Sequence, residues 1–127
     1  MKFLVVDDEK DVRALFELKL RKELKKGDFE IEFALSGEEA LEILKKKNPP
    51  EVVYIFSDIN MPGMSGIDLM HVVKKEFPYI HISMISAYGD VDSQSNAIKA
   101  GAKMFFTKPI DFDLVRTEIE QAMVGIN

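Results

Sequence analysis

Cysteine is absent from this chain of 127 residues. Its absence excludes thiol catalysis, iron–sulfur clusters and cysteine-based zinc sites, and it fits a reducing compartment. A chain of this length buries roughly two-thirds of the surface that its unfolded form exposes, so it needs no disulfide or structural metal to hold a core. The content of 46% hydrophobic and 31% charged residues is typical of a soluble globular domain. We therefore expect a single domain that spans residues 1–127.

The sequence also lacks an excess of positive charge. It has 17 Lys and Arg residues against 22 Asp and Glu residues, a net charge of -5. Nucleic-acid binding needs a basic excess gathered on one face. The local basic clusters are Lys19, Arg21, Lys22, Lys25 and Lys26 before Gly27, and Lys45, Lys46 and Lys47 before Asn48. We interpret both clusters as helix ends, where cations complement the helix dipole, and we expect no direct binding to nucleic acid.

No hydrophobic run is long enough to cross a membrane. The longest runs, such as residues 52–56, have the length of a strand, whereas a spanning helix needs roughly 20 apolar residues. Residues 1–6 lead directly into acidic residues and lack the hydrophobic region of a signal peptide. We expect no membrane insertion and a cytoplasmic protein.

Five short apolar runs alternate with segments of helical periodicity. The runs cover residues 2–6, 30–34, 52–57, 80–85 and 103–107. A strand–helix unit repeated five times predicts a parallel α/β sheet with helices on both faces, because each crossover must return over a face of the sheet. The segment 91–100 has the weakest helical pattern, and Asp111 is a candidate N-cap for the last helix. His81 and Ser83 place polar groups in a strand that we expect to be central.

Polar side chains follow four of the predicted strands. They are Asp7, Asp8 and Glu9 after the first run, Asp58 after the third, Ser86 after the fourth and Lys108 after the fifth. Parallel strands end at one edge, where open α/β sheets bind ligands, so these residues are expected to converge. Clustered carboxylates raise one another's pKa unless a cation lies among them, and Mg²⁺ prefers such oxygen ligands. With an ammonium and a hydroxyl beside them, they predict a site for phosphoryl transfer to a carboxylate.

These motifs together resemble the receiver domain of two-component response regulators. The resemblance rests on Asp7-Asp8, on Asp58 followed by Met61-Pro62-Gly63-Met64-Ser65-Gly66, on Ser86-Ala87 and on Lys108-Pro109. It covers essentially the whole chain in order and spacing. It implies a flavodoxin-like fold, a doubly wound parallel sheet of five strands in the order 2-1-3-4-5 with five helices.

The resemblance implies that Asp58 is the phosphoacceptor. Asp58 would attack a phosphohistidine of a sensor kinase or histidine phosphotransfer protein and form an acyl phosphate. Asp8 and Asp58 would bind Mg²⁺ through their carboxylates, Asn60 through its backbone carbonyl and Asp7 through a water molecule. The chain would then be a signalling phosphoacceptor rather than an enzyme, apart from its own phosphotransfer and slow autodephosphorylation.

The resemblance also assigns the residues around the phosphoryl group. Lys108 would pair with that group and precede Pro109 through a cis peptide bond, and Ser86 would donate a hydrogen bond to a phosphoryl oxygen. Phe105 would be the switch aromatic that turns inward when Ser86 moves. Tyr88, together with Asn60, would tune dephosphorylation, and we expect the bulky Tyr88 to prolong the phosphorylated state.

The implied output is a change of the surface formed by residues about 90–124. Phosphorylation adds about -1.5 to -2 charges at the sheet edge, and the domain responds if a second conformation binds that charge better. The partners would be a downstream protein target or an output domain, with a phosphorylation-dependent homodimer as another form of output. Val12 and its neighbours would be the docking patch for the phosphodonor, although core packing explains Val12 equally well.

Three other classes of protein stay open at this point. A degenerate receiver would act as a phosphorylation-independent interaction module, which the complete set of site residues argues against. An Mg²⁺-dependent aspartyl-phosphate phosphatase of the haloacid-dehalogenase type would need an Asp at the position of Asn60. A flavin electron carrier would need a phosphate loop where Asp7, Asp8 and Glu9 would repel phosphate. We expect the last helix to end near residues 125–127, with no room for an output domain, and the sequence leaves open a longer parent protein.

Overall fold

Strands alternate with helical segments along residues 1–125, the part of the chain that the computed structural model describes. The elements are β1 (Lys2–Val6), α1 (Lys10–Lys19), α2 (Arg21–Lys26), β2 (Glu30–Ala34), α3 (Gly37–Lys45), β3 (Val52–Asp58), α4 (Gly66–Glu76), β4 (His81–Ser86), α5 (Val91–Ala100), β5 (Phe105–Thr107) and α6 (Phe112–Met123). The end of the last helix was expected near residues 125–127; it ends at Met123, and residues 126–127 lie outside the described part. Among the described residues, no helix has the length and apolar character to span a membrane.

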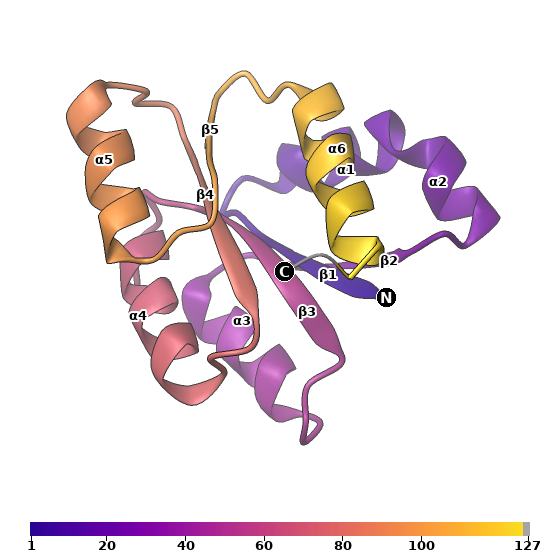
Figure 1. Cartoon of the computed structure of the whole chain (residues 1–127), viewed down its shortest axis with the longest axis horizontal. Helices are drawn as coiled ribbons and strands as arrows, with labels where there is room; N and C mark the ends of the chain where they lie inside the picture. Colours follow the sequence, from indigo (N-terminus) through magenta and orange to yellow (C-terminus); the bar gives the residue numbers. More distant parts are fainter. Residues whose placement is uncertain (126–127) are drawn as a thin grey trace.

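The five strands form one parallel sheet in the order β2-β1-β3-β4-β5 (Figure 1). Helices α3, α4 and α5 cover one face, and α1, α2 and α6 cover the other. Each face has its own apolar core, because successive side chains of a strand point to opposite faces. Leu4 and Ile55 belong to the first core, and Phe3 and Phe56 belong to the second. The predicted doubly wound fold and strand order are confirmed.

The predicted number of helices was wrong by one, because residues 10–26 form two helices instead of one. The backbone departs from helical geometry at the fully buried Leu20, with φ -107° and ψ 19°. Arg116 of α6 stabilises this break: its guanidinium donates to the Lys19 carbonyl at 2.9 Å and pairs with Glu23 of α2 at 2.7 Å. The break therefore depends on a tertiary contact that a helical repeat cannot reveal.

Three predicted strands also have different bounds. The third runs over Val52–Asp58 instead of 52–57. The fourth runs over His81–Ser86 instead of 80–85, and the fifth begins at Phe105 instead of residue 103. Lys103 still donates its backbone N–H to Ile82 at 2.8 Å, but the regular pairing with β4 starts only at Phe105. Asp58 and Ser86 are consequently the last residues of their strands and share the rigidity of the sheet.

A buried polar network explains why Ser83 stands in a central strand. The Tyr54 hydroxyl donates to Glu118 Oε2 at 2.6 Å and lies 2.6 Å from Ser83 Oγ, which also accepts the backbone N–H of Met104 at 3.1 Å. Lys103 pairs with the same Glu118 carboxylate. Burial raises the pKa of the Tyr54 hydroxyl, so it stays a donor. The network joins β3, β4 and the segment directly before β5 to α6.

Candidate functional site

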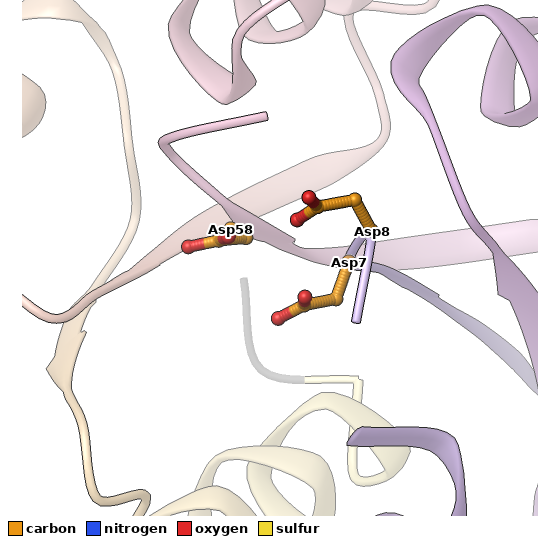
Figure 2. Close-up of side chains that lie close together, drawn as sticks. All are labelled: Asp7, Asp8 and Asp58. Atoms are coloured by element: carbon orange, nitrogen blue, oxygen red, sulfur yellow. The ribbon is translucent and has the colours of Figure 1, made fainter. Parts of the chain in front are cut away.

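Three aspartates meet at the carboxyl edge of the sheet (Figure 2). The register pairs Val6 of β1 with Ser57 of β3, so the residues that follow, Asp7 and Asp58, end side by side. Asp8 extends toward them from the same turn, and one carboxylate oxygen from each of the three lies within 4.8 Å of the others. Asp7 and Asp58 are each only 5% exposed, whereas Asp8 is exposed. The expectation that these three side chains lie close together is confirmed.

Lys108 provides the positive charge next to this cluster. Its ammonium lies 3.2 Å from Asp7 Oδ2, 3.6 Å from Asp58 Oδ1 and 3.6 Å from Glu9 Oε1. The Lys108 backbone N–H donates to the Ser86 carbonyl at 2.8 Å, and the bond to Pro109 is cis, as expected. One ammonium therefore faces several carboxylates, and the local charge is negative.

The pKa values of the cluster reflect this imbalance. Burial, and next the charge of Asp7, raise the pKa of Asp58 to about 6, against a smaller opposing effect of Lys108. Burial likewise raises the pKa of Asp7. Burial alone would lower the pKa of Lys108, but the charges of Asp58 and Asp7 outweigh it and raise that pKa. A cluster of three carboxylates, of which Asp8 is exposed to solvent, fits a hard divalent cation such as Mg²⁺.

Replacing Asp58 by Asn is expected to stabilise the metal-free protein above pH 7. Because the pKa of Asp58 is raised to about 6 in the folded state, its ionised form costs stability, and the cost grows as the pH rises from about 4 to about 6. The gain for Asp58→Asn should be on the order of 2 kcal/mol at pH 8 and vanish near pH 4. Urea unfolding in a chelator measures it, with the exposed Asp92→Asn as control. A less stable Asp58→Asn protein at pH 8 would contradict the conclusion that burial and the charge of Asp7 disfavour the ionised Asp58 carboxylate.

The loop after β3 is held close to Asp58 by backbone contacts. Gly66 N donates to the Ile59 carbonyl at 2.8 Å, and a Cβ on Gly66 would lie 2.2 Å from the Asp58 carbonyl oxygen. The Ser65 side chain caps α4 and forms a capping box with Asp68. Asn60 lies exposed in this loop, two residues after Asp58. The motif that follows Asp58 thus lets α4 begin directly against the end of β3.

The remaining predicted residues lie at the end of β4, in the loop that follows it and at the start of β5. Ser86 is 2% exposed, and its Oγ accepts the backbone N–H of Tyr88 at 3.0 Å. Tyr88 itself is 66% exposed. Phe105 is half-buried against the core beneath α3, α4 and α5, and it pairs in register with Met84, two residues before Ser86. The sheet therefore connects Ser86 and Phe105 through two adjacent strands.

Sequence reasoning did not assign a role to Glu9 or to Glu118. Glu9 is the N-cap residue of α1 and approaches Lys108, and its place directly after Asp7-Asp8 was the available signal. Glu118 is 4% exposed in α6. A carboxylate inside the apolar stripe of a helix could have signalled a buried partner.

The comparisons with known proteins agree with this geometry. A family model described as the response regulator receiver domain matches residues 3–120. Response regulator protein PilR of Pseudomonas aeruginosa is 34% identical over 122 residues, 96% of this chain but 26% of PilR. Sporulation initiation phosphotransferase F of Bacillus subtilis is 31% identical over 120 residues, 94% of this chain and 91% of that protein. A receiver domain structure from Clostridium thermocellum has a TM-score of 0.82 at 27% identity, covering 96% of this chain and 93% of the other.

The molecule is thus a flavodoxin-like α/β domain with an acidic site at the carboxyl edge of its sheet. The chain belongs to the response regulator receiver domain family. It spans about a quarter of the length of PilR and nearly all of the phosphotransferase.

Proposed function

We propose that residues 1–127 act as one receiver domain in which Asp58 accepts a phosphoryl group from a phosphohistidine. The observation that carries this proposal is the position of Asp58: it is buried at the sheet edge, 3.6 Å from the Lys108 ammonium and within reach of two further carboxylates. Its oxygen would attack phosphorus while the bond from phosphorus to the imidazole nitrogen breaks, and the freed imidazole takes up a proton. The product is an acyl phosphate.

Asp8, Asp58 and the Asn60 carbonyl would hold Mg²⁺, with Asp7 acting through a water molecule. The fit rests on the three carboxylates that the fold brings together. When bound, the metal neutralises charge on the phosphoryl oxygens. Lys108 supports the same charge from the other side, and Ser86 donates a hydrogen bond to a phosphoryl oxygen.

The partners that we infer are a histidine kinase or histidine phosphotransfer protein as donor, and a downstream protein target or output domain. The surface formed by residues about 90–124 would carry the response, with Phe105 as the switch aromatic and a phosphorylation-dependent homodimer as another form of output. This segment exposes Val91, Ile98 and Leu114, which suits a protein contact. We place this signalling domain in the cytoplasm and assign it no enzymatic role beyond its own phosphotransfer and autodephosphorylation.

Intact mass after incubation with acetyl phosphate tests the proposed function. We expect the wild-type protein to gain one phosphoryl group in Mg²⁺ and to gain none in a chelator, because the crowded carboxylates need a cation before a phosphate can approach. Asp58→Asn should gain none in either buffer. Labelling that is independent of Mg²⁺ would contradict the metal site, and no labelling with any donor would favour an interaction module.

Replacing Tyr88 by Ala is expected to shorten the lifetime of the phosphorylated state by about threefold to tenfold. Tyr88 is two residues after Ser86, whose Oγ accepts the backbone N–H of Tyr88. Removing the aromatic side chain of Tyr88 would open the acyl phosphate to water. Loss of the phosphoryl mass with time measures the rate, with Tyr79→Ala, an exposed tyrosine before β4, as control. A wild-type protein that loses its phosphoryl group faster than Tyr88→Ala would refute the shielding.

A further inference from the structure

Strand β5 has the least backbone support of the five strands. It has three residues, against five to seven in the others, and it lies at the edge of the sheet next to β4. Lysines hold both of its ends. Lys103, two residues before the strand, pairs with Glu118. Lys108, directly after the strand, pairs with Asp7 and Asp58. The position of so short a strand depends on such contacts, because few backbone hydrogen bonds fix it.

A chain of hydrogen bonds joins the segment before β5 to Glu118. Tyr54 has one hydroxyl hydrogen, which it donates to the Glu118 carboxylate at 2.6 Å. The contact of 2.6 Å between Tyr54 and Ser83 therefore uses the hydroxyl hydrogen of Ser83. The Ser83 oxygen still accepts the backbone N–H of Met104 at 3.1 Å. Every donor in the chain points toward the carboxylate, an arrangement in which the hydrogen bonds strengthen one another.

Lys103 closes this polar network around Tyr54. Its ammonium pairs with the Glu118 carboxylate and lies 5.5 Å from the centre of the Tyr54 ring, where a cation and an aromatic ring attract each other. Tyr54 and Glu118 are both buried. The network thus holds the two residues that precede Phe105: Lys103 through its side chain and Met104 through its backbone.

The proposed response moves Phe105, the first residue of β5, which pairs in register with Met84. Met104 is held on both sides of this pair, because its N–H donates to Ser83 and its carbonyl accepts the Met84 N–H at 3.0 Å. A displacement of β5 that turns Phe105 inward acts on Met104 through a single peptide bond. The network gives that displacement a free-energy cost, because a donor that leaves a buried acceptor is costly.

We propose that the polar network is a latch that holds β5 in its unphosphorylated position, a proposal that rests on the proposed function. The side chains of the latch are Tyr54, Ser83, Lys103 and Glu118. At the other end of β5, a phosphoryl group on Asp58 offers Lys108 new oxygens to pair with. The domain responds only if this gain exceeds the cost of opening the latch. The strength of the latch therefore sets the fraction of molecules that occupy the responsive conformation before phosphorylation.

A purely structural role of the network leads to the opposite expectation. Binding at the phosphoryl site is linked to the conformational equilibrium, so a variant with a weaker latch binds a phosphoryl mimic more tightly. A variant that only loses stability has a smaller folded fraction, so it binds the mimic equally well or more weakly. The sign of the change in affinity separates the two roles.

Beryllofluoride, a tetrahedral phosphoryl mimic that adds to a carboxylate oxygen, tests the latch. Fluorine NMR measures the concentration that half-saturates the protein in Mg²⁺. We expect Tyr54→Phe and Ser83→Ala each to lower this concentration by about threefold to tenfold relative to the wild-type protein. Val115→Ala is the matched control, because Val115 is fully buried in the same helix as Glu118 and its truncation costs stability without removing a polar group. This control should keep the wild-type value.

Acetyl phosphate separates the latch from the proposed function. Tyr54→Phe and Ser83→Ala should take up the phosphoryl group faster than the wild-type protein. Unchanged or weaker binding of beryllofluoride in both variants, with acetyl phosphate still labelling the wild-type protein, would overturn the latch and leave the proposed function standing. An equal gain in affinity for Val115→Ala would also overturn the latch, because general loosening of α6 would then explain it. Failure of acetyl phosphate and beryllofluoride with every protein would overturn the proposed function.

Discussion

Replacing Glu118 by Ala is expected to lower the free energy of unfolding by about 2–3 kcal/mol. The Glu118 carboxylate is 4% exposed, accepts the hydrogen bond of the Tyr54 hydroxyl at 2.6 Å and pairs with Lys103. Its removal leaves the Lys103 ammonium without its carboxylate partner and takes from the buried Tyr54 hydroxyl one of its two hydrogen-bond partners. This loss of free energy is smaller than the usual cost of breaking a buried ion pair, because the Lys103 side chain is 29% exposed and can turn to water.

Urea unfolding measures this loss, and two variants make the comparison sharp. Glu120→Ala removes an exposed carboxylate from the same helix and should change stability by less than about 0.5 kcal/mol. Glu118→Gln keeps an acceptor for Tyr54 but loses the charge beside Lys103, so it should fall between the wild-type protein and Glu118→Ala. Equal stability of Glu118→Ala and Glu120→Ala would show that the network does not hold α6 to the sheet.

Replacing Gly66 by Ala is expected to disturb both the fold and the phosphoacceptor. A Cβ at this position would lie 2.2 Å from the Asp58 carbonyl oxygen and 3.0 Å from Ile59 Cα, and backbone atoms cannot move aside as a side chain can. The end of β3 or the start of α4 must shift. We expect a loss of about 2–4 kcal/mol and phosphorylation by acetyl phosphate at least about tenfold slower, because small displacements at reacting groups are costly.

Gly37→Ala is the matched control for Gly66→Ala. Both glycines are buried and open a helix, but the Cβ at Gly37 would meet only the Met64 side chain, whose sulfur lies 2.7 Å away. A flexible methionine can move, and alanine favours the helix, so this variant should lose less than about 1 kcal/mol. Equal effects of the two substitutions on phosphorylation would mean that the contact with Asp58 does not position it.

The fold and the site cluster were within reach of the sequence because both depend on local patterns. Apolar runs of strand length identified the five strands. Asp7, Asp58 and Lys108 were then identified by their positions at, or directly after, the ends of those strands. Parallel topology then brings them to one edge without further information. The same reasoning could not find the break at Leu20, because Arg116 reaches it from the far end of the chain.

The polar network lay beyond the sequence for a related reason. Ser83 looked misplaced in a central strand, and nothing near it in sequence could satisfy its hydroxyl. Its partners, Tyr54 and Met104, come from other strands and loops, and the Glu118 carboxylate comes from α6. Residues that act through distant partners are visible only once the chain is folded, whereas a shared strand edge is visible from the order of the strands.

Locating the phosphoryl group within the chain is the most direct test that Asp58 is the phosphoacceptor. The protein is incubated with acetyl phosphate and Mg²⁺, and borohydride then reduces any acyl phosphate to homoserine, which peptide mass spectrometry assigns to a residue. Our account predicts homoserine at Asp58 alone, since this carboxylate lies beside Lys108 at the end of β3, and none in a chelator. Homoserine at Asp7 or Asp8 instead of Asp58 would contradict the account.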